Sequence, residues 1–216
     1  LFDLYAPFVD LFVLVLHPKH AAMIDSHCKD VNLPIEFALQ TSPTGMLDAI
    51  LIPQSLVQKH LKYDDDQVWI TWCDQIAVHI KTVEQLATAA GQNDGVVMPT
   101  VAKRQPYIHW VRNEDGEIVE LLQQREGDEM PDIGEGDMGL FSMSRLTYVD
   151  LLQRFAAEAG VGHKTKERNF LPFIPWLAGK VPVETFPVHN EIESIGINTR
   201  TELALIENYL NGKTKT

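Results

Sequence analysis

Short apolar runs alternate with segments of helical character in the first half of the chain, and this alternation constrains the fold most. Leu11–Leu16 is an apolar run, and a proline directly after it favours a helix over Pro18–Lys29. Pro34–Leu39 and Val68–Trp72 also have the composition of buried strands. A regular exchange of strands and helices is typical of a largely parallel sheet with helices on both faces. The sequence therefore predicts an α/β protein.

Further elements follow from helical periodicity and from turn residues. Thr82 and Gln85 form a capping-box pattern, which predicts that a helix opens here and runs through Ala90. Tyr107–Val111 and Ile118–Gln123 flank a polar turn that ends in glycine, so they predict a β-hairpin. The other predicted elements are a helix over Thr44–Ile52, strands over Val96–Val101, Met138–Met143 and Val181–Pro187, an amphipathic helix over Arg145–Ala159, and a helix to Leu210 that begins at the capping box of Thr199 and Glu202.

Composition restricts the class of protein. A chain of 216 residues with 45% hydrophobic and 22% charged residues predicts one globular domain over residues 1–216. The net charge of −12 disfavours a nucleic-acid partner, because binding to a phosphate backbone relies on clustered Lys and Arg. No apolar run approaches the ~20 residues needed to cross a bilayer, so no membrane partner is expected. Cys28 and Cys73 have neither a zinc-site nor a disulfide-framework spacing, and a cytoplasmic location is predicted.

Asp74 follows the predicted strand Val68–Trp72 after a single residue. A carboxylate is costly to bury without a partner, so it belongs at the strand's carboxyl end or beside a compensating group. Ligands of open α/β sheets gather outside the carboxyl ends of the strands, and this favours a binding role for Asp74. An aspartate in this position also caps turns and helices, and the residue types alone leave both interpretations open.

Several sequence blocks recur in an order that resembles one enzyme family. The blocks are QTSPTGMLDA at 40–49, the segment around Asp74, QQREGD at 123–128, EGDMGLF at 135–141 and EIESIGINTRTEL at 191–203. Together they resemble the sugar-1-phosphate nucleotidyltransferases, closest to the N-acetylglucosamine-1-phosphate uridylyltransferases. The resemblance implies a Rossmann-like, mostly parallel mixed sheet of the nucleotide-diphospho-sugar transferase fold, with the hairpin as a small insertion.

The same resemblance implies roles for individual residues. Asp74 and Asn198 look like the ligands of a catalytic Mg²⁺, which needs only one or two protein oxygens when water and phosphate complete its shell. Arg125 looks like a contact to the sugar phosphate, and its planar guanidinium suits that anion. The residues implied in nucleotide binding are Gln40, Thr44 and Gly45, and those implied in sugar binding are Asp137, Gln123 and Gln124.

The chain departs from the family pattern at its amino terminus. Leu1–Phe8 corresponds to the helix after a first strand and a glycine-rich loop, and that strand and loop, which grip the triphosphate in the family, have no counterpart here. Cys73 stands in place of a glycine, Ile108 lies near an expected glycine, and Gln123 or Gln124 replaces an acidic sugar contact.

Two explanations fit these departures. Either the sequence omits residues that the whole protein has, or the chain is a degenerate relative that binds nucleotide-sugars without turnover. Losing the first strand would leave backbone groups unpaired in the middle of the sheet, which favours omission.

The expected reaction joins a nucleoside triphosphate and a sugar-1-phosphate. A phosphate oxygen of the sugar-1-phosphate attacks the α-phosphorus, and pyrophosphate leaves as the nucleotide-sugar forms. Such a pyrophosphorylase needs positioning and charge neutralisation rather than a protein nucleophile. The alternative function is a non-catalytic nucleotide-sugar binding or regulatory module. A glycosyltransferase of similar fold would show two aspartates flanking one residue, whereas Gln75 and Ile76 follow Asp74.

Overall fold

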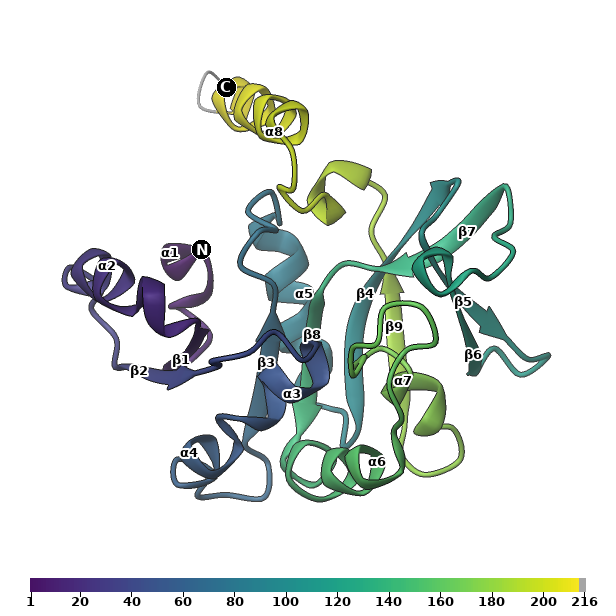
Figure 1. Ribbon diagram of the computed structural model, residues 1–216, viewed down its shortest axis with the longest axis horizontal. Coiled ribbons are helices and arrows are strands. Elements are labelled where there is room, and N and C mark those ends of the chain that lie inside the picture. The colour runs from purple at the N-terminus through teal and green to yellow at the C-terminus, as the bar shows by residue number, and fades with distance from the viewer. Residues whose placement is uncertain (214–216) are drawn as a thin grey trace.

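The computed structural model describes residues 1–213 and shows a mixed α/β protein, as predicted (Figure 1). Its strands form one larger sheet and two strand pairs. The strands are β1 (Phe12–Leu16), β2 (Ile35–Leu39), β3 (Gln67–Thr71), β4 (Val96–Arg104), β5 (Ile108–Arg112), β6 (Ile118–Gln123), β7 (Ile133–Asp137), β8 (Leu140–Ser144) and β9 (Val183–Pro187). The helices are α1 (Phe2–Tyr5), α2 (Pro18–Cys28), α3 (Met46–Leu51), α4 (Gln54–Gln58), α5 (Ile80–Ala90), α6 (Leu152–Glu158), α7 (Phe173–Trp176) and α8 (Arg200–Lys213).

The larger sheet has the order β3-β8-β4-β7, and β9 pairs with β4. β9 is parallel to β4, whereas β8 is antiparallel to both β3 and β4. β3, β4 and β9 therefore run in one direction and β7 and β8 in the other. The sheet is mixed, as expected, but its pairings are less parallel than the sequence suggested. The reason is that the chain passes from the β5-β6 hairpin back into the sheet without a helical crossover, which parallel pairing would need.

β7 and β8 are two strands separated by a sharp bend at Gly139. The backbone of Gly139 has φ +62, and a Cβ there would lie 2.0 Å from Cδ1 of Trp72 and 2.2 Å from Oε1 of Gln75. Only glycine fits this combination of a left-handed conformation and a close approach. Because of the bend, β7 pairs with Thr100–Arg104 and β8 with Val96–Val97 of the same strand. Asp137 lies at the end of β7, directly before the bend.

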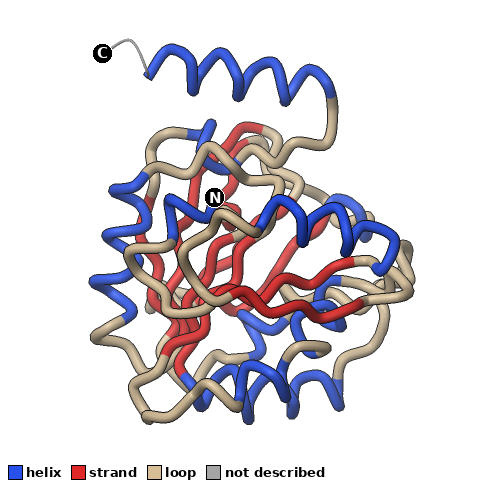
Figure 2. The backbone as a smooth tube through the Cα atoms, turned by 90° about the vertical axis from the view of Figure 1, so that its left-hand side faces the viewer, coloured by secondary structure: helices blue, strands red, loops and turns tan. Residues whose placement is uncertain are grey.

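Helices cover both faces of the larger sheet, and alternate residues of β4 enter two separate cores (Figure 2). Val96 and Met98 pack in the core that includes Phe155 of α6 and Phe173 of α7. Val97 packs in the core that includes the α5 residues Val83, Leu86 and Ala90. The predicted layering of helices on both faces is therefore present.

A strand pair, β1 with β2, stands beside the larger sheet rather than in it (Figure 1). β1 and β2 are parallel, and among the described strands β1 pairs only with β2, and β3 only with β8. Side chains bridge the two sheets, since the Phe8 ring stacks on Trp69 with centroids 6.1 Å apart and the Tyr5 and Thr71 hydroxyls lie 3.3 Å apart. β1 and β3 thus each have one edge without a partner strand.

The predicted β-hairpin is present as β5 and β6, but the predicted start of α5 is wrong. α5 begins at Ile80, and Nδ1 of His79 accepts a hydrogen bond from the backbone N–H of Lys81 at 3.2 Å. The Thr82 hydroxyl instead donates to the Glu193 carboxylate at 2.7 Å. The Thr82 side chain therefore bonds Glu193, far along the chain, instead of capping α5.

The predicted helix over residues 145–159 is present with an irregular start. It opens with a π-helical turn over Thr147–Leu151 and continues as α6. The wide π turn shifts the backbone hydrogen-bonding pattern. Nε2 of Gln54 donates to the carbonyls of Tyr148 and Val149, at 2.7 and 3.3 Å. A side chain from α4 therefore fixes this turn.

Residues 1–213 contain no helix that is long and apolar enough to span a membrane. Both cysteines are free thiols, Cys28 buried and Cys73 exposed. Burial raises the pKa of the Cys73 thiol, and the neighbouring Asp74 charge raises it further. Cys73 therefore remains a thiol rather than a reactive thiolate at neutral pH.

Candidate active site

Asp74 follows β3 and lies against a segment from the carboxyl-terminal part of the chain. Its backbone carbonyl accepts a hydrogen bond from the N–H of Ile197 at 3.1 Å. A Cβ on Gly196 would lie 2.8 Å from Oδ2 of Asp74, so this carboxylate rests directly on the glycine. The structure thus brings the segment directly before Asn198 against Asp74.

Asn198 is exposed and lies at the start of α8. Its backbone N–H donates to Oε2 of Glu202 at 2.8 Å, and its side-chain Nδ2 donates to the carbonyl of Gly196 at 3.3 Å. Oε2 of Glu202 also accepts from the N–H of Thr199 at 2.7 Å, which confirms the predicted capping box. These hydrogen bonds, from Asn198 first, lower the pKa of Glu202. The amide oxygen of Asn198 accepts no hydrogen bond within the described part of the chain and is available to a ligand.

The turn before Asn198 is anchored to the sheet and to α5. Glu193 is 5% exposed, and its Oε2 accepts from the N–H of His79 at 2.8 Å and from the hydroxyl of Thr82. The carbonyl of Ser194 accepts from Nζ of Lys103 at 3.4 Å. Hydrogen bonds to α5 and its N-cap and to β4 therefore fix residues 191–194. Because Asn198 follows only four residues later, these bonds also help to determine where it lies.

Tyr107 lies among the charged residues that the sequence singled out. Burial raises the pKa of its hydroxyl to about 12, together with the charges of Asp137, Asp74 and Glu202, while Arg125 lowers it. Tyr107 as a whole is 50% exposed. Charges from four residues that are distant in the sequence therefore act on this one hydroxyl. Sequence reasoning used Tyr107 only as the start of a strand.

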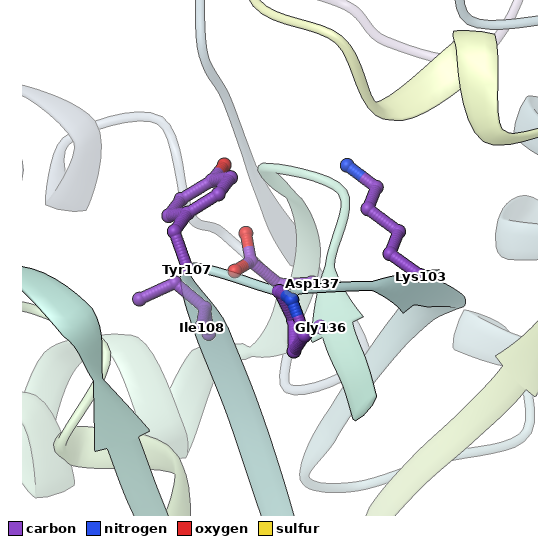
Figure 3. Close-up of a pocket in the computed structure, with 6 residues that line it drawn as sticks. Lys103, Tyr107, Ile108, Gly136 and Asp137 are labelled. Carbon is purple, nitrogen blue, oxygen red and sulfur yellow. The ribbon is translucent and has the colours of Figure 1, made fainter. Parts of the chain in front are cut away.

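A small cavity lies beside this tyrosine (Figure 3). It is lined by Lys103, Pro106, Tyr107, Ile108, Gly136 and Asp137. Asp137 is 8% exposed, and its Oδ2 accepts from the N–H of Gly139 at 2.7 Å. Burial raises the pKa of Asp137, against the opposite effects of the Gly139 N–H and the Lys103 charge. Burial lowers the pKa of Lys103, against the charges of Asp137 and Glu191. Lys103 was not among the site residues predicted from the sequence.

The predicted site residues Gln123, Gln124 and Arg125 lie near this cavity, but their contacts differ. Gln123 pairs with Ile108 in the hairpin, and its Oε1 accepts from Nδ2 of Asn169. Gln124 and Arg125 are exposed in a single 3₁₀ turn, and the N–H of Gln124 donates to the Tyr107 carbonyl at 3.0 Å. A second cavity of about 220 Å³ is lined by Gln123, Glu126, Phe155, Ala159, Gly160, Val161, Gly162, Asn169 and Pro172.

The predicted nucleotide-binding block has structural contacts of its own. Nε2 of Gln40 donates to the carbonyl of Gly45 at 3.4 Å. Gly45 has φ +124, and a Cβ there would lie 2.3 Å from the carbonyl oxygen of Arg168. The carbonyl of Thr44 accepts from the N–H of Arg168 at 2.8 Å. The need for glycine at this position therefore follows from the packing of the segment around Arg168.

The side chains of Asp74 and Asn198 carry the oxygen donors that a hard divalent cation prefers. Within residues 1–213, no three His, Cys, Asp or Glu side chains gather as a metal cluster. Asp74 and Asn198 instead offer one carboxylate and one amide oxygen, which is the small donor set that Mg²⁺ accepts when phosphate and water supply the rest.

Comparison with known proteins finds distant relatives. No protein-family model matches the chain. The chain is 25% identical over 201 residues to the bifunctional protein GlmU of Francisella tularensis subsp. novicida (strain U112), and the same values hold for that of subsp. tularensis (strain WY96-3418). The match covers 89% of this chain and 42% of each relative. The chain therefore spans about two fifths of the length of the curated relatives it matches.

Proposed function

We propose that this chain is the nucleotidyltransferase domain of a magnesium-dependent, cytoplasmic sugar-1-phosphate nucleotidyltransferase with the nucleotide-diphospho-sugar transferase fold. It makes a nucleotide-sugar and pyrophosphate from a nucleoside triphosphate and a sugar-1-phosphate. The similarity to GlmU supports a nucleotidyltransferase. The observation that carries the proposal is the contact of Asp74 with Gly196 and Ile197, because a cation shared by Asp74 and Asn198 requires these two segments to meet.

The roles of the residues follow from their chemistry. Asp74 and Asn198 would hold Mg²⁺ through their side-chain oxygens, and the ion would supply neutralisation of phosphate charge. Arg125, exposed beside Tyr107, binds the phosphate of the sugar-1-phosphate through its guanidinium. Asp137, which lines the small cavity beside Tyr107, binds the sugar. The sugar phosphate is anionic at neutral pH, so its oxygen attacks without a protein base, and pyrophosphate leaves with the electron pair of the broken P–O bond.

The division of the sheet supports the omission of a strand from this sequence. β1 and β3 each have an edge without a partner among the described strands, and one further strand between them would pair with both. We propose that the whole protein has this strand, followed by a loop that binds the triphosphate. The alternative, a non-catalytic nucleotide-sugar binding module, requires that no such loop exist.

Pyrophosphate release tests the proposal. The full-length protein, with Mg²⁺ and a panel of nucleoside triphosphates and sugar-1-phosphates, should release pyrophosphate with at least one pair. Asp74→Asn should reduce kcat by about 100-fold or more, because a metal ligand and its charge are lost. Asp94→Asn, an exposed aspartate after α5, is the matched control and should leave kcat unchanged. A fully active Asp74→Asn enzyme would contradict the assignment, and nucleotide-sugar binding without pyrophosphate release would favour the alternative.

A further inference from the structure

The side chain of Gln75 lies buried between two segments of the candidate active site. Gln75 directly follows Asp74 in the chain and is 4% exposed. Its Nε2 donates a hydrogen bond to the carbonyl of Ser194 at 3.5 Å. Gln75 therefore connects the turn after β3 to the turn over residues 191–194.

A second hydrogen bond joins the same two segments. The N–H of Ile197 donates to the carbonyl of Asp74 at 3.1 Å, three residues after the Ser194 carbonyl that Gln75 bonds. Between these two positions of the chain, Gly196 lies so close to Asp74 that a Cβ there would be 2.8 Å from Oδ2. Two hydrogen bonds and one close contact thus fix Asp74 relative to the segment that leads into α8.

The Gln75 side chain also contacts the bend next to Asp137. Its Oε1 lies against the backbone of Gly139, where a Cβ would be 2.2 Å from this oxygen. The N–H of Gly139 in turn donates to the Asp137 carboxylate. Gln75 thus adjoins or contacts the segments that carry three of the predicted site residues, Asp74, Asp137 and Asn198.

Stability of the fold does not explain the amide of Gln75. Its Oε1 is buried and accepts no hydrogen bond within residues 1–213. A buried acceptor without a partner costs free energy, and an apolar side chain of similar length would avoid that cost. The Ser194 carbonyl would keep a donor without Gln75, because Nζ of Lys103 bonds it at 3.4 Å. A role other than stability therefore accounts for the amide.

We propose that Gln75 is a positioning residue, which holds Asp74 and the segment leading to Asn198 at the separation that a shared cation requires. It acts through its hydrogen bond to Ser194 and touches neither the cation nor a substrate. This inference rests on the proposed function, because it gives Gln75 a part in that same site. Loss of the amide should weaken cation binding and leave the fold intact.

Gln75→Met tests the proposal, because methionine matches the length of glutamine and lacks the amide. The probe is Mn²⁺, a substitute for Mg²⁺ whose binding is followed by its EPR signal. The full-length variant should bind Mn²⁺ about fivefold more weakly than wild type, as expected when one hydrogen bond is lost. Its Tm should fall by no more than about 2 °C. Unchanged Mn²⁺ binding, or a larger fall in Tm, would overturn the proposal.

Residue-resolved hydrogen exchange measures the positioning without a cation or a substrate. The Ile197 amide, which bonds the Asp74 carbonyl, should exchange about fivefold faster in Gln75→Met, while the amides of β4 keep their wild-type rates. The matched control is Gln85→Met, at an exposed position of α5, which should behave as wild type in every measurement. An unchanged exchange rate at Ile197 would overturn the proposal.

The outcomes also separate this inference from the proposed function. If the wild type releases pyrophosphate and Gln75→Met binds Mn²⁺ equally well, the role of Gln75 is wrong and the nucleotidyltransferase stands. If Mn²⁺ binding depends on Gln75 but no pyrophosphate is released, the positioning stands and the proposed reaction is wrong. If the wild type neither binds Mn²⁺ nor releases pyrophosphate, both are wrong.

Discussion

Asp137 carries a charge that the surrounding protein compensates only in part. Burial raises its pKa, while the N–H of Gly139 and the charge of Lys103 act against that rise. A buried carboxylate that is compensated only in part lowers the stability of the folded state. Such groups are typical of binding sites, where the ligand supplies the missing partner.

The stability of Asp137→Asn should therefore depend on pH. The pKa of Asp137 is higher in the folded than in the unfolded state, so its contribution to stability is greatest in acid and is lost as the pH rises through the folded-state pKa. Asparagine is neutral at every pH. We expect Asp137→Asn to raise the free energy of unfolding above that pKa by about 1–3 kcal/mol, with no gain in acid. Urea unfolding over a pH series measures this difference.

Asp132→Asn is the control for this measurement, because Asp132 is exposed. Its unfolding free energy should stay within about 0.5 kcal/mol of wild type at every pH. An Asp137→Asn protein that is less stable than wild type at neutral pH would show that the carboxylate is well compensated.

Gly139 offers a comparison with a second glycine of positive φ. Both Gly139 and Gly116 have this conformation, but a Cβ at Gly116 would meet no atom within 4 Å. Gly116→Ala should cost about 1–2 kcal/mol, the strain of a left-handed conformation alone. Gly139→Ala adds collisions with Trp72 and Gln75 and should cost about 3 kcal/mol or more. Thermal unfolding compares the two, and equal losses would show that the bend can relax.

At the scale of elements, the turn over residues 191–194 positions the start of α8. Glu193→Ala removes the acceptor for the N–H of His79 and the Thr82 hydroxyl, and should lower stability by about 2–3 kcal/mol. Glu193→Gln keeps an acceptor oxygen and should restore most of the loss. Glu84→Ala, at an exposed position of α5, should change little. Chemical denaturation measures all three variants.

The Mg²⁺ dependence of the activity distinguishes a purely structural role of Glu193 from a role in positioning Asn198. If this turn positions Asn198, Glu193→Ala should raise the Mg²⁺ concentration needed for half-maximal activity, and Glu193→Gln should lower it again. A loss of stability with unchanged Mg²⁺ dependence would restrict Glu193 to folding.

Elements defined by local patterns were predicted well from the sequence. The apolar runs that predict β1, β2 and β3 lie within a residue or two of the observed strands, and the turn at Gly116 identified the hairpin. The predicted cap at Thr82 was wrong because its hydroxyl bonds Glu193, a contact that no local pattern contains. The bend at Gly139 and the π turn at Thr147–Leu151 likewise depend on distant side chains.

The candidate site was predictable only through the family resemblance. Asp74 and Asn198 are far apart in the sequence, and no spacing rule relates them, although their segments meet in the fold. Their binding roles remain predictions. Lys103 was missed because its neighbours Tyr107 and Asp137 come together only through strand pairing and the hairpin.

At the scale of the whole molecule, the divided sheet predicts uneven stability. Open strand edges leave backbone groups to water, and β1 and β3 each have one such edge. Hydrogen exchange should therefore be faster in β1 and β3 than in β4, which has partners on both edges. A longer form of the protein that supplies a strand between β1 and β3 should slow exchange in both. Equal protection of β1, β3 and β4 in the present chain would contradict this expectation.

The bend at Gly139 connects the cavity directly to the hydrophobic core. Asp137, on one side of it, faces the cavity, and Leu140, on the other, is fully buried under α5. A ligand that binds Asp137 would therefore contact a backbone that also runs through the hydrophobic interior. Binding in this cavity should therefore stiffen the centre of the protein, beyond the atoms that the ligand touches.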